Sequence, residues 1–223
     1  FKQIAAIVTE LGYVPPEVVH YAFVLLVDGK MSTRQGTVVL LEDFMKEAVN
    51  KAKSEISKRE DNVDEARAKK IAYGAVKYSI QKTSNERNVI FDWNSSLLFE
   101  GDTGPYILYS YARINSILKK CDLTSLNGYN YSHMTHEYEL DLVKIMSEFS
   151  DVVEKAVYES SPHVITHFTY ELAKRFSVFY KNCSILNAKD RIIKDNRIRL
   201  ILAVKQVLEN ALYIIGIDPV EYM

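Results

Sequence analysis

Asp28–Gly36 reads DGKMSTRQG, and it lies between two apolar runs, Tyr21–Val27 and Thr37–Leu41. Asp-Gly between two such runs is the strongest short-range signal for a chain reversal between strands. The segment is longer than a tight turn needs, and between its glycines it carries two cations and two hydroxyls. These groups suit an anionic ligand such as a phosphate. The alternative is a solvated hairpin tip with ordinary surface side chains.

The composition is that of an ordinary soluble globular protein: 223 residues, 48% hydrophobic and 26% charged, enough for one or two domains. The formal net charge of −1 neither supports nor excludes nucleic-acid binding, because a local basic face can lie on a neutral chain. Cys121 and Cys183 are far apart in sequence and are expected to be reduced thiols. No apolar run is long enough to span a membrane. The chain begins at Phe1 without a signal pattern, so we expect Phe1 to be internal to a longer protein.

The first forty residues predict one helix and one strand. Apolar residues at helical spacing predict a helix over Phe1–Leu11 that ends at Gly12. Val18–Val27 is predicted to be a buried strand. One helix and one hairpin bury too little to fold alone. We therefore expect the end of a larger α/β domain.

Two amphipathic helices are predicted next. Leu41–Lys58 places its apolar residues on one face. Its charged surface, Lys46–Arg59, is expected to be solvated. Asn62–Glu65 resembles a capping arrangement, and the helix after it would run to about Gln81.

A domain boundary is predicted near residue 100. Val89–Trp93 is expected to be a short extended piece, with Trp93 as a packing anchor. Gly101–Pro105 is dense in turn residues and suits the start of a helix, with Pro105 in the first turn. Helices are then predicted over 106–120, 135–149, 151–160, 162–182 and 189–216. Successive amphipathic helices predict a helical bundle.

The segment Asp28–Gly36 also resembles a sequence motif of a known protein family. Lys30–Arg34 resembles the KMSKS signature of class I aminoacyl-tRNA synthetases, and His20–Ala48 resembles arginyl-tRNA synthetase in particular. Further stretches resemble that family along nearly the whole chain: Ala72–Arg87, Phe91–Trp93, Phe99–Tyr106, Tyr109–Arg113, Pro162–His163, Leu172–Tyr180 and Arg199–Ile217. The end resembles the family's helical DALR domain, although at Asn196–Arg199 only the arginine of that four-letter motif matches.

The resemblance implies a mainly α fold. A helical anticodon-binding bundle over 101–223 would follow the end of a Rossmann-type catalytic domain, with its signature loop and helical stem, over 1–100. Nothing in the chain resembles the family's HIGH signature or arginine pocket. We therefore expect the C-terminal part of an arginine–tRNA ligase, inactive by itself.

The resemblance also implies the chemistry of the intact enzyme. Arginine would be activated with ATP and Mg²⁺ and then passed to its tRNA. Catalytic roles fall on Lys30, Met31, Ser32, Thr33 and Arg34, and the ATP contacts on Lys30, Ser32 and Arg34. Cations at the triphosphate would stabilise the charge that moves toward pyrophosphate. Thr33 replaces the second lysine of the signature, and Arg34 is the nearest substitute cation.

The bundle would bind the anticodon loop, whose bases can stack on aromatic or arginine planes. The candidate tRNA-binding residues are Tyr106, Tyr109, Tyr111, Arg113, Arg197, Arg199, Tyr222 and Met223. The tyrosines have an alternative role as half-buried packing residues. Arg197 and Arg199 also have an alternative role, as ion-pair partners of nearby acidic residues.

No metal site is expected. His163 and His167 are four residues apart, but no acidic or cysteine cluster completes a site. His133 and His136 are expected at a helix entry. We expect a cytoplasmic monomer whose partners are tRNA for arginine, ATP and arginine. Two other classes stay open, a non-catalytic RNA-binding or assembly module and a purely structural helical bundle.

Overall fold

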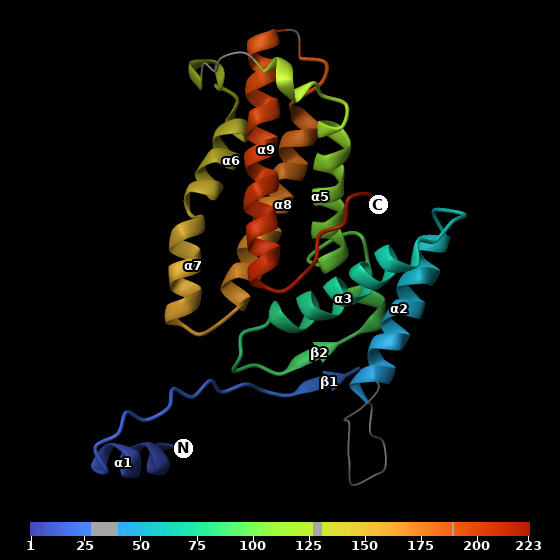
Figure 1. Ribbon diagram of the computed structural model, residues 1–223. Helices are drawn as coiled ribbons and strands as arrows, with labels where there is room; N and C mark the ends of the chain where they lie inside the picture. The colour runs from blue at the N-terminus through green and yellow to red at the C-terminus, as the bar shows by residue number, and fades with distance from the viewer. Residues whose placement is uncertain (28–39, 127–130, 189) are drawn as a thin grey trace.

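The computed structural model describes residues 1–27, 40–126, 131–188 and 190–223. Helices dominate the fold, and Figure 1 shows an upright bundle standing over a layer of two helices and two short strands. The bundle consists of α5 (Gly104–Leu118), α6 (Glu137–Ser147), α7 (Phe149–Tyr158), α8 (His163–Asn182) and α9 (Arg191–Ile214). Two 3₁₀ turns, η2 (Leu123–Ser125) and η3 (Tyr131–His133), lie between α5 and α6. The mainly α fold expected from the sequence is confirmed.

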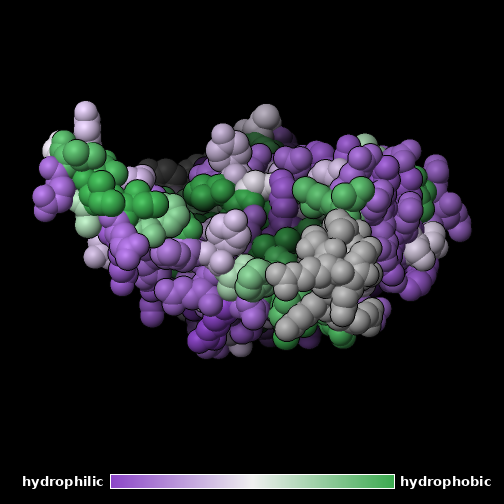
Figure 2. Space-filling view, turned by 90° about the horizontal axis from the view of Figure 1, so that it is seen from below, coloured by the Kyte–Doolittle hydropathy of each residue, from purple (hydrophilic) through white to green (hydrophobic). Residues whose placement is uncertain are grey.

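The N-terminal segment carries α1 (Lys2–Glu10), which ends as expected before Gly12, a residue with φ of +79°. Figure 1 shows α1 apart from the bundle, and Figure 2, from below, shows its hydrophobic side chains gathered at the left. The long buried strand predicted over Val18–Val27 is wrong. Only β1 (Val24–Leu26) is a strand, and its residues are half-buried. Strand β2 (Val89–Phe91) pairs with β1 in parallel over three residues. This short pairing sets the length of β1.

Helices α2 (Leu41–Ser57) and α3 (Glu65–Gln81) confirm the predicted helical stem. The predicted cap is wrong by two residues. Asp64, not Asn62, caps α3, because its carboxylate accepts hydrogen bonds from the backbone N–H groups of Ala66 and Arg67.

Trp93 is a packing anchor, as expected. It opens the short helix α4 (Trp93–Ser96), and its ring centroid lies 4.6 Å from that of Phe44 and 4.8 Å from that of Phe91. These rings belong to a small core between α2, α3 and β2. This core holds the stem against the strand pair.

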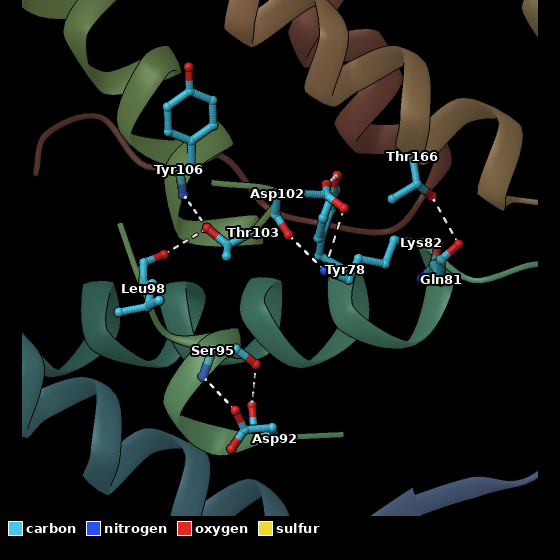
Figure 3. Close-up of polar contacts among 10 residues, drawn as sticks. All are labelled: Tyr78, Gln81, Lys82, Asp92, Ser95, Leu98, Asp102, Thr103, Tyr106 and Thr166. Carbon is cyan, nitrogen blue, oxygen red and sulfur yellow. Dashed lines mark hydrogen bonds and ion pairs between the residues drawn. The ribbon is translucent and has the colours of Figure 1, made fainter. Parts of the chain in front are cut away.

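A polar joint connects the stem to the bundle (Figure 3). Tyr78 donates a hydrogen bond of 2.5 Å to the Asp102 carboxylate, and Lys82 donates to the Asp102 carbonyl at 2.8 Å. Thr103 caps α5 by accepting from the N–H of Tyr106, and its hydroxyl donates to the Leu98 carbonyl. The predicted helix start at Gly101–Pro105 is confirmed, with Pro105 in the first turn.

The larger core extends across the predicted domain boundary. Ile71 and Tyr78 of α3 lie in the same cluster as Leu108 of α5 and Leu208 of α9. The C-terminal tail, residues 215–223, adds Ile217 and other residues to that cluster. The stem helix α3 therefore packs as a part of the bundle.

Candidate nucleic-acid interface

The predicted catalytic and ATP-binding residues, Lys30, Met31, Ser32, Thr33 and Arg34, lie outside the described residues, as does most of the predicted chain reversal. They precede α2, which begins at Leu41.

A pocket of about 290 Å³ lies where the stem, the bundle and the C-terminal tail meet. We call it the Tyr109 pocket, and its lining residues are Ile56, Arg59, Glu60, Arg67, Ile71, Phe99, Tyr109 and Met223. Three apolar side chains, an aromatic ring and a phenol surround it, together with two arginines and one carboxylate. Two of the predicted tRNA-binding residues, Tyr109 and Met223, come together here although 114 positions separate them in sequence.

Two arginines shape this pocket. The Arg59 guanidinium lies over the Phe99 ring, 4.2 Å from its centroid. Arg67 is 5% exposed and donates from both terminal nitrogens to the Glu60 carboxylate, at 3.3 and 2.5 Å. Its buried Nε has no hydrogen-bond partner among the described residues. Arg67 is therefore held in the pocket wall by Glu60, with one buried donor left without an acceptor.

The C-terminal tail runs antiparallel to α3 and is held at both ends. Lys77 donates to the carbonyl of Gly216, and Gln81 donates to the carbonyl of Ile215 at 3.0 Å. At the other end, the Tyr222 hydroxyl donates to the Asp64 carboxylate at 2.9 Å, and its ring lies under Arg67. These contacts fix Met223 in the pocket wall.

Of the predicted tRNA-binding tyrosines, only Tyr109 lines the pocket. Tyr106 is half-buried against α8, where its hydroxyl donates to the Ser177 hydroxyl at 3.0 Å. Tyr111 is 1% exposed in the core, and burial raises its pKa to about 12. A ring enclosed in this way offers no free face for stacking. Sequence spacing could not separate the three rings, because all of them fall in the first two turns of one helix.

Arg113 lies beside the pocket, half-buried between two phenol rings. Its guanidinium donates to the Tyr109 hydroxyl at 2.6 Å and stacks 4.5 Å from the centroid of that ring. The Tyr180 ring lies 5.0 Å away on another side. No carboxylate pairs with Arg113 among the described residues.

The two C-terminal arginines make internal contacts. Arg197 Nε donates to the Glu139 carboxylate at 2.6 Å, in a pair whose side chains are 14% and 2% exposed. Its Nη1 also donates to the Ser184 carbonyl. Arg199 donates to the Leu126 carbonyl at 3.0 Å. Of the two roles open for Arg197, the structure shows the pairing with an acidic residue.

Sequence reasoning missed four polar or aromatic residues of the pocket: Arg59, Glu60, Arg67 and Phe99. Arg59 is exposed, as expected of the charged surface that it ends, but its stacking on Phe99, two residues past the end of α2, was not foreseen. Arg67 carried a usable signal, because it lies four residues before the buried Ile71 on the apolar side of α3. A charged residue at such a position needs a partner.

Histidines take structural positions. His136 caps α6, as expected of a helix-entry residue, and the Glu139 carboxylate accepts from its backbone N–H. His163 contacts the Ser161 hydroxyl at 2.6 Å. In the described parts of the chain, no cluster of three or more His, Cys, Asp or Glu side chains is arranged to hold a metal ion. Nor is any described helix both long enough and apolar enough to cross a bilayer.

Comparisons with known proteins define the class. Residues 107–223 match the DALR anticodon binding domain, and residues 1–93 match the catalytic domain of class I tRNA synthetases (R). Both are parts of class I aminoacyl-tRNA synthetases, in the order that the fold shows.

Individual relatives, each longer than this chain, indicate which class I synthetase it resembles. An arginine–tRNA ligase of Clostridium perfringens is 39% identical over 208 residues, which covers 92% of this chain and 37% of that protein. One of Clostridium botulinum (strain Alaska E43) is 37% identical over all of this chain and 40% of its own length. The solved arginyl-tRNA synthetase of Thermus thermophilus superimposes with a TM-score of 0.82 at 29% identity, covering 91% of this chain and 35% of that one. The Plasmodium falciparum structure, at 23% identity, shares the fold with a TM-score of 0.80.

The chain belongs to the arginyl-tRNA synthetase family. It spans about two fifths of the length of the curated relatives that it matches. The resemblance of the sequence to this family is thereby confirmed.

Proposed function

We propose that the bundle and its C-terminal tail bind the anticodon loop of tRNA for arginine, in the service of arginine–tRNA ligation. The observation that carries this proposal is the Tyr109 pocket. It joins a phenol ring of α5, an arginine-stacked phenyl ring and the terminal residue of the chain around one cavity.

A single unstacked nucleobase suits the chemistry of this pocket. Loop bases offer flat faces for stacking on aromatic and guanidinium planes, and their edges carry hydrogen-bond acceptors. Tyr109 supplies the aromatic plane, and the exposed Arg59 guanidinium, which lines the same pocket, supplies hydrogen-bond donors. Stacking of one base on an aromatic side chain is worth about 1–3 kcal/mol. Tyr222 contributes by holding Met223 in place.

The segment Lys30–Arg34 is proposed to act on ATP. Lys30 and Arg34 bind triphosphate oxygens, Ser32 donates a hydrogen bond, and Met31 and Thr33 position the loop. Mg²⁺ accompanies the ATP. Cations at the departing pyrophosphate stabilise the charge that develops there. The support is the match of residues 1–93 to the class I catalytic domain.

The 223-residue polypeptide alone is proposed not to activate arginine, since it contains no HIGH signature. ATP–pyrophosphate exchange with arginine and tRNA tests this directly. Exchange above background by the purified chain would contradict it. We further propose a domain boundary near residue 100 and a cytoplasmic monomer that uses tRNA for arginine, ATP and arginine in the intact enzyme.

Two rival functions predict different binding. A purely structural bundle binds no RNA, whereas a non-catalytic RNA module binds RNA without preference for an arginine anticodon. The test uses an RNA stem-loop that carries an arginine anticodon and a second one that differs in the anticodon bases. We expect preferential binding of the first, and roughly tenfold weaker binding by Tyr109→Ala. Tyr106→Phe, which keeps the α5 ring packed against α8 and lies outside the Tyr109 pocket, is the control.

A further inference from the structure

We infer that a second pocket, beside the first, binds a backbone phosphate of the same RNA loop. This inference rests on the proposed function. The pocket has a volume of about 490 Å³ and lies between the C-terminal ends of α5 and α8 and the segment after α8. We call it the Lys181 pocket. Its polar lining includes Arg113, Lys120, Tyr180, Lys181, Asn182 and Asn187.

Charge distinguishes this pocket. Three cations line it, and none of its described lining residues is Asp or Glu. The Tyr109 pocket, by contrast, contains Glu60 beside its arginines. Lys120 and Lys181 are exposed and make no ion pair among the described residues. An uncompensated set of cations with hydroxyl and amide donors favours an anion.

Arg113 differs from the other partly buried arginines in its partners. Three other arginines with side chains at most a third exposed, Arg67, Arg175 and Arg197, each pair with a carboxylate. Arg113 is held instead by the faces of Tyr109 and Tyr180. Its guanidinium is thus fixed in place while its charge is left for a ligand, an arrangement that suits phosphate recognition.

The helix ends do not account for the lysines. Cations at helix C-termini can complement unpaired carbonyl groups. Among the described residues, neither the Lys120 nor the Lys181 ammonium group donates to a carbonyl at these helix ends; the Ile117 and Phe179 carbonyls accept from the N–H groups of Lys120 and Cys183 instead. The ammonium groups of Lys120 and Lys181 are therefore available to an external anion.

Position connects the two pockets. Tyr109 lines the first, Arg113 lines the second, and these two side chains are in contact. A base on Tyr109 would therefore place its neighbouring phosphate near Arg113. Tyr180 adds a half-exposed ring on the same path.

The salt dependence of RNA binding tests the inference. Lys120→Ala/Lys181→Ala removes two cations without touching the Tyr109 pocket. Each phosphate contact to a single strand contributes about 0.7 to the slope of log Kd against log salt. Binding of the arginine stem-loop should weaken roughly tenfold at about 0.1 M salt, and the slope should fall by about 0.7, the contribution of one phosphate. Preference for the arginine anticodon should persist.

The control is Lys119→Ala/Lys144→Ala, which removes two exposed lysines from the ends of α5 and α6, outside the pocket. It should leave affinity and slope unchanged, and thermal unfolding checks that both variants fold. An unchanged slope in Lys120→Ala/Lys181→Ala overturns the inference even if anticodon preference holds. A reduced slope without anticodon preference in the wild-type chain supports the inference but overturns the proposed function. If the wild-type chain does not bind the stem-loop, both are overturned.

Discussion

Gly104 lies so close to the backbone of Gly74 that a Cβ atom on it would be 2.6 Å from the Gly74 carbonyl oxygen. Glycine at position 104 lets the start of α5 cross α3 at backbone contact. Gly74 in turn lies beneath Leu108 and Ile217, where a Cβ would lie 3.0 and 3.2 Å from their methyl groups. The stem, the bundle and the tail therefore meet at this glycine pair.

Gly104→Ala should destabilise the chain by about 2 kcal/mol or more, because backbone rather than a flexible side chain must give way. Urea unfolding followed by circular dichroism measures the change. Ser54→Ala, on the exposed face of α2, is the control and should have little effect. Equal stability of Gly104→Ala and the wild type would mean that the two helices separate easily.

Tyr78→Phe tests the polar joint that Figure 3 shows. The Tyr78 phenol is buried against the Asp102 carboxylate. Its pKa is raised mainly by burial and, to a smaller extent, by the hydrogen bond to Asp102. Loss of a hydrogen bond to a charged acceptor should cost about 1.5 kcal/mol. Lys82 still lies 3.4 Å from Asp102 and limits the loss. Thermal unfolding provides the measurement, and an unchanged midpoint would show that the bond contributes nothing net.

Arg197→Ala should destabilise the bundle by about 3 kcal/mol, because it leaves the buried Glu139 carboxylate without its partner. Adding Glu139→Gln should recover part of the loss by removing the stranded charge. Folded Arg197→Ala should keep the wild-type salt slope for RNA binding. A lower slope would instead assign Arg197 to a phosphate contact.

The tail contact at Asp64 should respond to acid. The Tyr222 hydrogen bond, with backbone donors of α3, lowers the pKa of Asp64. The pKa of this carboxyl group is lower in the folded chain than in the unfolded chain, where it is near 3.8. The ionised carboxylate therefore stabilises the fold fully at pH values above the unfolded pKa. That stabilisation is lost as pH falls through the folded value.

Tyr222→Phe removes the largest cause of this shift, so the pKa of Asp64 should rise toward its ordinary value. Carbon NMR titration of the Asp64 carboxyl group measures both proteins. Identical titration curves would show that the tail does not bind Asp64 in solution.

Much of this fold could be predicted because its helices are long and periodic. Leu41–Ser57, Glu65–Gln81 and the five bundle helices lie within a few residues of their expected bounds. The strand before Asp28–Gly36 could not be placed, because exposed residues such as Tyr21 and Phe23 have the apolar character of a buried strand. Its length depends on pairing with β2, which is a long-range contact.

The site was only partly predictable. The family resemblance pointed to Tyr109 and Met223, but the burial of Tyr111 and the pairing of Arg197 depend on tertiary packing. Arg59 and Phe99 meet only because α2 ends beside the segment before α5. A local pattern does not contain that contact.

The most direct test of the account is the binding of the arginine-anticodon stem-loop to the wild-type chain and to Tyr109→Ala, each against the stem-loop with altered anticodon bases. The account predicts that the wild-type chain prefers the arginine anticodon and that Tyr109→Ala loses most of this preference while it remains folded. Equal preference in the two proteins would contradict the assignment of the Tyr109 pocket to a nucleobase.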